Sequence, residues 1–256
     1  MIIFSIIPEF LLSDLEDFKI KRSQEVNLVS TNIEIRSIQA IFNKFVEEEI
    51  FEYSKLSGVK QFKIENKKEL AIEGVDIIRI LNAAKEKDFH MNQIIRLTLL
   101  TASRISEVLS IKIKDIDFDK GIINIYQQKT NCCKTIPLEG RLTELLKEIL
   151  KSYIEGFDYS QKERFIFYNK SKNYPYTKLR ADTVSKKFKK ILRQLNLSED
   201  FKFHSLRHTA ISELMSNKIQ INVVKEIAGH ESIITTMGYS HVRSEDMKQA
   251  VNSMNF

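Results

Sequence analysis

Several side chains in the second half of this chain are of the types that act on phosphate groups. Four of the five histidines lie between positions 204 and 241. The segment HSLRH places His204 and Arg207 three residues apart, and residues at this spacing share one face of a helix. His230 follows Arg207 by 23 residues, and Tyr239 follows His230 by nine. The histidine cluster therefore comes with an arginine and a hydroxyl nucleophile.

Two further cations lie upstream of this cluster. Arg104 stands in TASRISEVLS, and Lys129 stands in a stretch whose pattern predicts a β-hairpin. Attack on a phosphodiester needs positive donors around the non-bridging oxygens, because charge grows there in the transition state. A guanidinium suits this role because it makes bidentate bonds to phosphate and stays charged. With Tyr239 as nucleophile and a proton donor for the leaving oxygen, the set predicts phosphoryl transfer.

Neither zinc binding nor ordinary helix polarity accounts well for the histidines. Zinc binding is disfavoured because the sequence has no HExxH pair and the histidine spacings match no zinc pattern. Ordinary polar residues on helices would account for any one histidine, but not for the whole set in this order. There is no ATP-binding loop or glycine-rich phosphate cradle, and the chain has seven glycines. We therefore expect no metal and no cofactor.

The order Arg, Lys, His-x-x-Arg, His, Tyr closely resembles the tyrosine recombinases, also called the phage integrase or Xer-like family. The matching segments are TASRISEVLSIKIKDID, a hairpin ending in IPL, HSLRHTAISEL and AGHESIITTMGYSHV. The resemblance implies a site-specific DNA recombinase or integrase that cleaves and rejoins strands through a 3′-phosphotyrosyl intermediate. Because that bond keeps the energy of the cut strand, resealing would need no cofactor.

The resemblance also implies a role for each matched residue. Tyr239 would be the nucleophile that frees a 5′-hydroxyl, and Arg104 and Arg207 would clamp the scissile phosphate. His204 and His230 would bind the phosphate region and assist proton transfer.

The general acid implied by the resemblance is a hairpin lysine, and the hairpin has two. Counting back from Pro137, the matching position is Lys129, whereas counting forward from Arg104 reaches Gln128. We favour Lys129 over Lys134, because the end of a hairpin anchors the register better than the length of a strand does.

Three further residues lie beside these positions. Glu107, one helical turn after Arg104, matches an acidic position of the family and would orient that arginine. A solvent-facing helix glutamate is the alternative. His208 and His241 flank the matched residues, and we expect both to be structural or to lie beside the phosphate, and neither to be catalytic.

A basic segment runs from Lys178 to Arg193 and carries seven basic residues and one acidic residue. Contact with the DNA backbone would explain it, and so would a solvated helix face. The candidates for DNA binding are Lys178, Arg180, Lys186, Lys187 and Lys190.

The hydrophobic pattern predicts a mainly α fold with a small β-hairpin or sheet, in two domains. A helix over 33–52, capped by Ser30-Thr31-Asn32, follows a weaker one at 12–22. Residues 53–68 have the composition of a linker. The resemblance to the tyrosine recombinases implies that residues 1–68 form a short helical core-binding (SAM-like) domain, reduced or truncated, that closes a clamp on DNA, and that residues 69–256 form the catalytic domain.

The second domain is predicted to be mostly helical. Its helices are expected at 74–87, 91–101, 104–112, 140–154, 180–195, 206–217, 221–228 and 244–254. A hairpin is expected from 122–127 and 133–137, with a short strand at 164–168.

The basic charge favours a polyanionic partner, and a basic drift of the sequence without function would explain it equally well. The net charge is +6, with −1 on the first 68 residues and +7 on the rest. No apolar run reaches the roughly 18 residues that a membrane helix needs. The start MIIFSIIPEFLL lacks the basic lead-in and cleavage site of a secretory signal. Adjacent Cys132 and Cys133 are unsuited to a mutual disulfide and suggest a reducing cytoplasm.

The partner implied by the resemblance is double-stranded DNA with an inverted-repeat recombination site, bound by a homotetramer or together with a second recombinase. The apolar stripe of the helix at 244–254 would pack either on a neighbouring subunit or on its own chain. We expect no membrane and no small-molecule substrate. A type IB topoisomerase is disfavoured by the compact spacing. A DNA-binding protein of the same fold with weak or lost catalysis is disfavoured because every catalytic position is filled.

Overall fold

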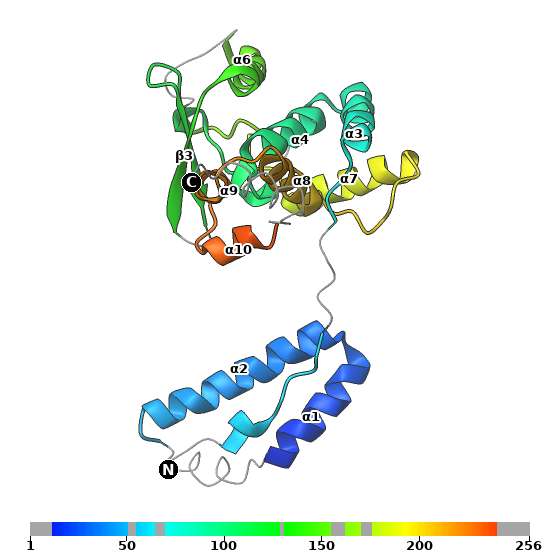
Figure 1. The fold of residues 1–256 in the computed structure, drawn as a ribbon, viewed down its shortest axis with the longest axis vertical. Coiled ribbons are helices and arrows are strands. Elements are labelled where there is room, and N and C mark those ends of the chain that lie inside the picture. The colour runs from blue at the N-terminus through cyan, green and yellow to red at the C-terminus, as the bar shows by residue number, and fades with distance from the viewer. Residues whose placement is uncertain are drawn as a thin grey trace, which may run out of the picture. The chain divides into compact units, whose positions relative to one another are not determined.

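The structure of the chain, a computed structural model, describes residues 12–50, 55–64, 70–128, 131–154, 162–169 and 176–239. Helices dominate it, and a small antiparallel sheet is added to them (Figure 1). The prediction of a mainly α fold with a small sheet is confirmed. Contacts divide the chain into two units, Met1–Lys68 and Glu69–Phe256.

The elements of the two units follow in chain order. The first unit holds α1 (Leu12–Glu25), α2 (Leu28–Glu47) and the 3-10 turn η3 (Lys55–Gly58). The helices of the second are α3 (Gly74–Lys87), α4 (Phe89–Thr101), α5 (Ile105–Val108), α6 (Gly140–Ile154), α7 (Ala181–Gln194), α8 (Phe203–Ser216), α9 (Ile221–Ala228) and α10 (Ile233–Met237). Its remaining elements are η4 (Ile113–Asp115), β1 (Ile116–Asp117), β2 (Ile122–Gln127) and β3 (Cys132–Pro137).

The first unit is a pair of helices closed by the segment that follows them. Its core consists of Leu15 on α1, Ile35 on α2, and Leu56 and Val59 from the segment after α2. The prediction that residues 53–68 form only a linker is therefore wrong at Leu56 and Val59, which are buried in this core. Leu56 and Val59 stand among many polar residues in the sequence, so the composition of the segment gave no indication that they are buried.

The start of α2 also differs from the prediction. Asn27 is the N-cap, and its Oδ1 accepts a hydrogen bond from Ser30 N at 2.9 Å. Asn32, expected in the cap, instead lies inside the helix and is buried. Its amide donates to Phe62 O and its Oδ1 accepts from Phe62 N, both at 2.9 Å. The Asn32 amide thus hydrogen-bonds both backbone groups of Phe62, as a neighbouring strand would, and holds the segment after α2.

Helix α4 is the centre of the second unit. It packs against α3, α6, α7 and α8, and Figure 1 shows α3 and α7 on the side of α4 away from the sheet. Met91, Ile94, Ile95 and Leu97 are each no more than 1% exposed. A helix that is apolar on several faces must be surrounded by other elements. The end of α4 is therefore held firmly in the interior.

The sheet confirms the predicted hairpin and adds a third strand. Its order is β1-β2-β3, with all pairs antiparallel. In the register of β2 and β3, Ile123 lies opposite Ile136 and Ile125 opposite Lys134. Alternate residues point inward, so Ile123 and Ile125 of β2 are buried, and Ile136 and Lys134 face inward from β3.

Two other elements of the second unit differ from the predictions. The helix expected at 104–112 is helical only over Ile105–Val108, because the chain then extends and Ile166 N donates to Ile111 O at 3.0 Å. The expected strand at 164–168 forms only isolated bridges, Lys112 with Phe165 and Tyr168 with Lys178.

The predicted helix at 244–254 lies outside the described residues. Of the helices that are described, none has both the length and the apolar character needed to span a membrane.

The amide of Asn32 yields a stability prediction for the first unit. Asn32→Ala removes both hydrogen bonds to Phe62 and leaves part-buried backbone groups without their partner, at a cost of about 2 kcal/mol. Hydrogen-exchange protection of the α2 amides in the full chain should fall by roughly 30-fold. Ser37→Ala, at an exposed position of the same helix, is the matched control. Equal protection in the two variants would contradict the role given to Asn32.

Candidate active site

The turn that follows α4 positions the first candidate residue. Ala102 adopts a left-handed conformation with φ of 47° and ends α4, and Arg104 is the N-cap of α5. Glu107 is 5% exposed, and its carboxylate accepts from Arg104 N at 2.9 Å and from Arg104 Nη1 at 2.7 Å. Both the backbone and the guanidinium of Arg104 are thus oriented by one buried carboxylate. This is the contact expected of Glu107 from the sequence.

Arg207 reaches the same turn from α8. Its side chain is 2% exposed, and Nη1 donates to Ala102 O at 2.6 Å. Nη2 is also buried, and it has no hydrogen-bond partner among the described residues. Burial and the positive charge of Arg104 lower the pKa of Arg207 to about 10, so the guanidinium is still protonated at neutral pH. The two arginines therefore meet at one turn, across 103 residues of sequence.

His230 lies at the end of α9. Gly229 ends that helix with φ of 64°, and His230 Nδ1 is hydrogen-bonded to Thr236 Oγ1 at 2.9 Å. Burial, followed by repulsion from Arg207 and Arg104, lowers the pKa of His230 to about 4. The imidazole is therefore neutral at physiological pH, with its orientation set by Thr236.

Tyr239 follows α10 and lies among imidazoles. Its ring is stacked on His230 at 6.3 Å and on His208 at 5.4 Å, between ring centroids. Its hydroxyl is hydrogen-bonded to His208 Nδ1. His204 joins the group through its ring, 4.6 Å from that of His208. The structure thus gathers Tyr239 and three of the four histidines that precede it, His204, His208 and His230.

His208 takes a more central place than the sequence suggested. Burial, followed by the charge of Arg207, lowers its pKa to about 4, so it is neutral and can accept a hydrogen bond. The signal in the sequence was the spacing of four from His204, which puts both rings on one face of α8. Its contact with Tyr239 joins residues 31 positions apart, and no local pattern indicates it.

The two hairpin lysines are placed differently. Lys129 lies outside the described residues, as does His241. Lys134 is buried, and its Nζ donates to two main-chain carbonyls beside the arginine and histidine positions. Burial is the main cause that lowers its pKa to about 7.

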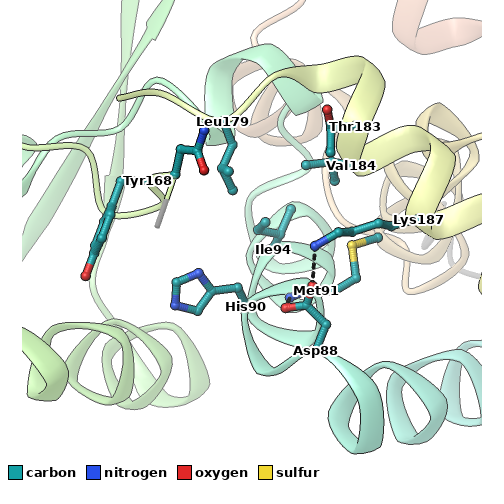
Figure 2. A pocket seen from close by; sticks show the side chains of 10 residues that line it. Asp88, His90, Met91, Ile94, Tyr168, Leu179, Thr183, Val184 and Lys187 are labelled. Atoms are coloured by element: carbon teal, nitrogen blue, oxygen red, sulfur yellow. Dashed lines mark hydrogen bonds and ion pairs between the residues drawn. The ribbon is translucent and has the colours of Figure 1, made fainter. Parts of the chain in front are cut away.

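The candidate DNA-binding residues Arg180, Lys186, Lys187 and Lys190 are exposed, and Lys178 is half-buried. Val184, Phe188, Ile191 and Leu192 bury the opposite face of the helix. Lys187 pairs with Asp88 at 2.5 Å at the rim of a pocket that Thr183 and His90 also line (Figure 2). The other four candidates are Lys178, which is hydrogen-bonded to Ser110, Arg180, 3.6 Å from Asp182, and the helix residues Lys186 and Lys190.

The part of the chain that the structure describes offers no cluster suited to a metal ion. Within those ranges, no three His, Cys, Asp or Glu side chains gather closely enough to hold one. The described cationic groups are arranged to meet an anion instead.

Comparisons with known proteins place the chain in a family. Residues 71–246 match the family model described as "Phage integrase family". The chain is 27% identical over 234 residues to tyrosine recombinase XerA of Pyrococcus furiosus, covering 91% of this chain and 77% of that one. It is 31% identical over 154 residues to a probable integrase/recombinase of Methanocaldococcus jannaschii, and this match covers 58% of this chain and 44% of the relative.

Solved structures agree on the fold. The integrase of transposon Tn1549, in complex with transposon right-end DNA, aligns with a TM-score of 0.77 at 16% identity, covering 96% of this chain and 86% of that one. A lambda integrase tetramer bound to a Holliday junction aligns with a TM-score of 0.73 at 18% identity, covering 92% and 66%.

The chain therefore belongs to the phage integrase family. It is a DNA recombinase of the tyrosine type, as the motifs in its sequence predicted.

The neutral histidines yield a pH prediction. In the unfolded chain both His208 and His230 have a pKa near 6.5, so between pH 6.5 and 4 the unfolded state binds more protons than the folded state. The free energy of unfolding should therefore fall as the pH is lowered through this window, by about 1–2 kcal/mol per histidine at pH 5. Urea unfolding at pH 7 and pH 5 tests this. The variant with both His208→Gln and His230→Gln should lose less stability between the two pH values than the wild type. An equal loss would contradict the prediction.

A glycine pair tests how the turn before His230 is built. Gly229 and Gly121 both have φ of 64°, so alanine strains the backbone equally at each. A Cβ at Gly229 would lie 2.0 Å from Gln127 Nε2, whereas one at Gly121 meets nothing within 4 Å. Gly229→Ala should therefore destabilise the second unit by about 1–2 kcal/mol more than Gly121→Ala in thermal unfolding. Equal losses would show that Gln127 moves aside at no cost.

Proposed function

We propose that this chain cleaves and rejoins double-stranded DNA at an inverted-repeat site through a covalent bond between Tyr239 and a backbone phosphate. The observation that carries the proposal is the buried Nη2 of Arg207, which has no partner among the described residues. A buried guanidinium nitrogen that lacks an acceptor costs stability. A non-bridging phosphate oxygen would satisfy it with a charge-assisted bond.

Two arginines would hold the scissile phosphate. Arg104 and Arg207 converge on the turn at Ala102, and Glu107 holds Arg104 in place. Their charges would stabilise the phosphorane-like transition state, whose equatorial oxygens gain negative charge. His204 and His230 would donate to the same oxygens and assist proton transfer.

The reaction would proceed by two exchanges at phosphorus. The Tyr239 oxygen attacks the phosphate, forming the O–P bond while the bond to the 5′-oxygen breaks. The tyrosine proton passes to an imidazole, for which His208 is placed by its hydrogen bond to the hydroxyl. The 5′-oxygen takes a proton from Lys129. In the second exchange a 5′-hydroxyl attacks the phosphotyrosine and gives its proton back to Lys129, while His208 returns a proton to the Tyr239 oxygen as the tyrosine–phosphorus bond breaks. No cofactor is needed.

The assembly would place four such sites on two DNA duplexes. The lambda integrase tetramer on a Holliday junction shares the fold and supports this arrangement for the present chain. The first unit would close the other half of a clamp on DNA, as a core-binding domain. The basic residues Lys178, Arg180, Lys186, Lys187 and Lys190 would contact phosphates. The enzyme would act on cytoplasmic DNA.

Covalent capture tests the nucleophile. The purified chain is incubated with sheared DNA of its own host and denatured with SDS, and the DNA that stays attached is sequenced. Wild-type protein should enrich a discrete inverted repeat. Tyr239→Phe should retain DNA binding but form no covalent adduct, because its ring lacks the attacking oxygen.

A second pair of variants checks the phosphate clamp. Arg207→Ala should lower the rate of adduct formation by about 10²-fold or more, with a smaller effect on DNA affinity. Lys186→Ala, on the exposed face of α7, should weaken affinity slightly without changing the rate on bound DNA. Covalent DNA captured by Tyr239→Phe would refute the nucleophile assignment. Capture by neither protein would favour a fold that binds DNA without cutting it.

A further inference from the structure

Lys134 occupies an unusual place for a lysine. It lies on β3 in register with Ile125, and the alternation of the strand directs it inward beside Ile136. Its exposed fraction is 7%. Lysine is seldom buried unless its amine is bound, because the loss of hydration is costly. The contacts of the amine therefore explain why it is there.

The amine joins the ends of two helices. Its Nζ donates to Thr101 O at 3.0 Å and to Ile227 O at 2.7 Å. Thr101 is the last residue of α4, and Ile227 is the next to last residue of α9. Carbonyls in the last turn of a helix lack intrahelical partners and carry the negative end of the helix dipole. One cationic donor therefore satisfies two helix ends that are 126 residues apart in sequence.

Each of these helix ends leads directly to an active-site residue. Arg104 lies three residues after Thr101, and His230 lies three residues after Ile227. A second hydrogen bond joins the same sheet to the end of α9: Gln127 Nε2 donates to Gly229 O at 3.1 Å. A shift of either end would move a guanidinium or an imidazole by a similar distance.

We propose that Lys134 is a positioning residue of the recombination reaction, which holds the ends of α4 and α9 so that Arg104 and His230 meet the same phosphate. This inference rests on the function proposed above. It separates the roles of the two hairpin lysines: Lys134 acts through Arg104 and His230, and Lys129 protonates the leaving oxygen.

The surroundings of the amine agree with this division. Burial has the largest effect on its pKa, which falls to about 7, while Glu107 favours the ammonium form and the two arginines, Arg207 and Arg104, disfavour it. A primary amine has N–H groups for both carbonyls whether or not it carries the extra proton. The positioning contacts therefore do not depend on transfer of a proton.

A modified leaving group distinguishes positioning from proton donation. The probe is a nicked duplex with the inverted repeat recovered by covalent capture, made with either the natural 5′-oxygen or a 5′-bridging sulfur at the cut. A thiolate leaves without a proton, so the sulfur duplex rescues the loss of a general acid but not the loss of position. The variants are Lys134→Met, Lys134→Arg, Lys129→Met and Lys120→Met. Lys120 is an exposed lysine at the opposite end of the hairpin.

The expected results differ for each lysine. Lys134→Met should form adducts about 10²-fold more slowly on both duplexes, since small displacements of catalytic groups have effects of this size. Lys134→Arg should keep most of the rate on the oxygen duplex, because a guanidinium can bind both carbonyls yet is a poor proton donor. Lys129→Met should be slow on the oxygen duplex and restored on the sulfur duplex. Lys120→Met should match the wild type.

Three outcomes would overturn the proposal. Rescue of Lys134→Met or Lys134→Arg by sulfur would make Lys134 the proton donor, and a wild-type rate in Lys134→Met would leave it no role. If Lys134→Met fails to bind the duplex, the Arg variant alone decides, because a proton donor and a positioning residue predict opposite rates for it on the oxygen duplex. If the wild type forms no adduct on either duplex, the proposed function itself falls, and this inference with it.

Discussion

The site depends on one buried hydrogen bond, from Arg207 Nη1 to the carbonyl of Ala102. Each buried N–H group of a guanidinium that lacks an acceptor costs stability, and Arg207 is 2% exposed, so this bond favours a structure in which α8 and the end of α4 stay together. Arg104 begins the next helix from the same turn. The bond therefore sets the distance between the two arginines, and the remaining contacts of the site are arranged around it.

Positive charge accumulates at this turn beyond what folding alone would favour. Burial is the largest cause that lowers the pKa of Arg207, Lys134 and His230, and the charge of Arg104 lowers all three further. Glu107 offsets part of this repulsion through its bonds to Arg104. A phosphodiester would relieve the rest, so the same repulsion that weakens the fold strengthens the binding of an anion.

Local pattern predicted much of the fold because helical and strand periodicity lie within a few residues. The helices α3, α4, α6 and α9 and the hairpin were expected at nearly their observed bounds. The predictions failed where a contact with a distant segment determines the local structure. Asn32 was predicted to cap α2, but it lies inside the helix and binds Phe62. The chain after Val108 was predicted to stay helical, but it is extended and pairs with the segment around Ile166. Propensity does not encode partners of that kind.

The sequence by itself determined the family and the types and order of the site residues, because phosphate chemistry restricts which side chains can serve and their spacing is written directly in the chain. Only the tertiary structure decided which atoms meet. Register turned Lys134 inward to two helix ends, folding brought the hydroxyl of Tyr239 to His208, and burial left Nη2 of Arg207 without a partner among the described residues. Each of these facts depends on packing between segments about 30 to more than 100 residues apart, and such contacts have no local signature.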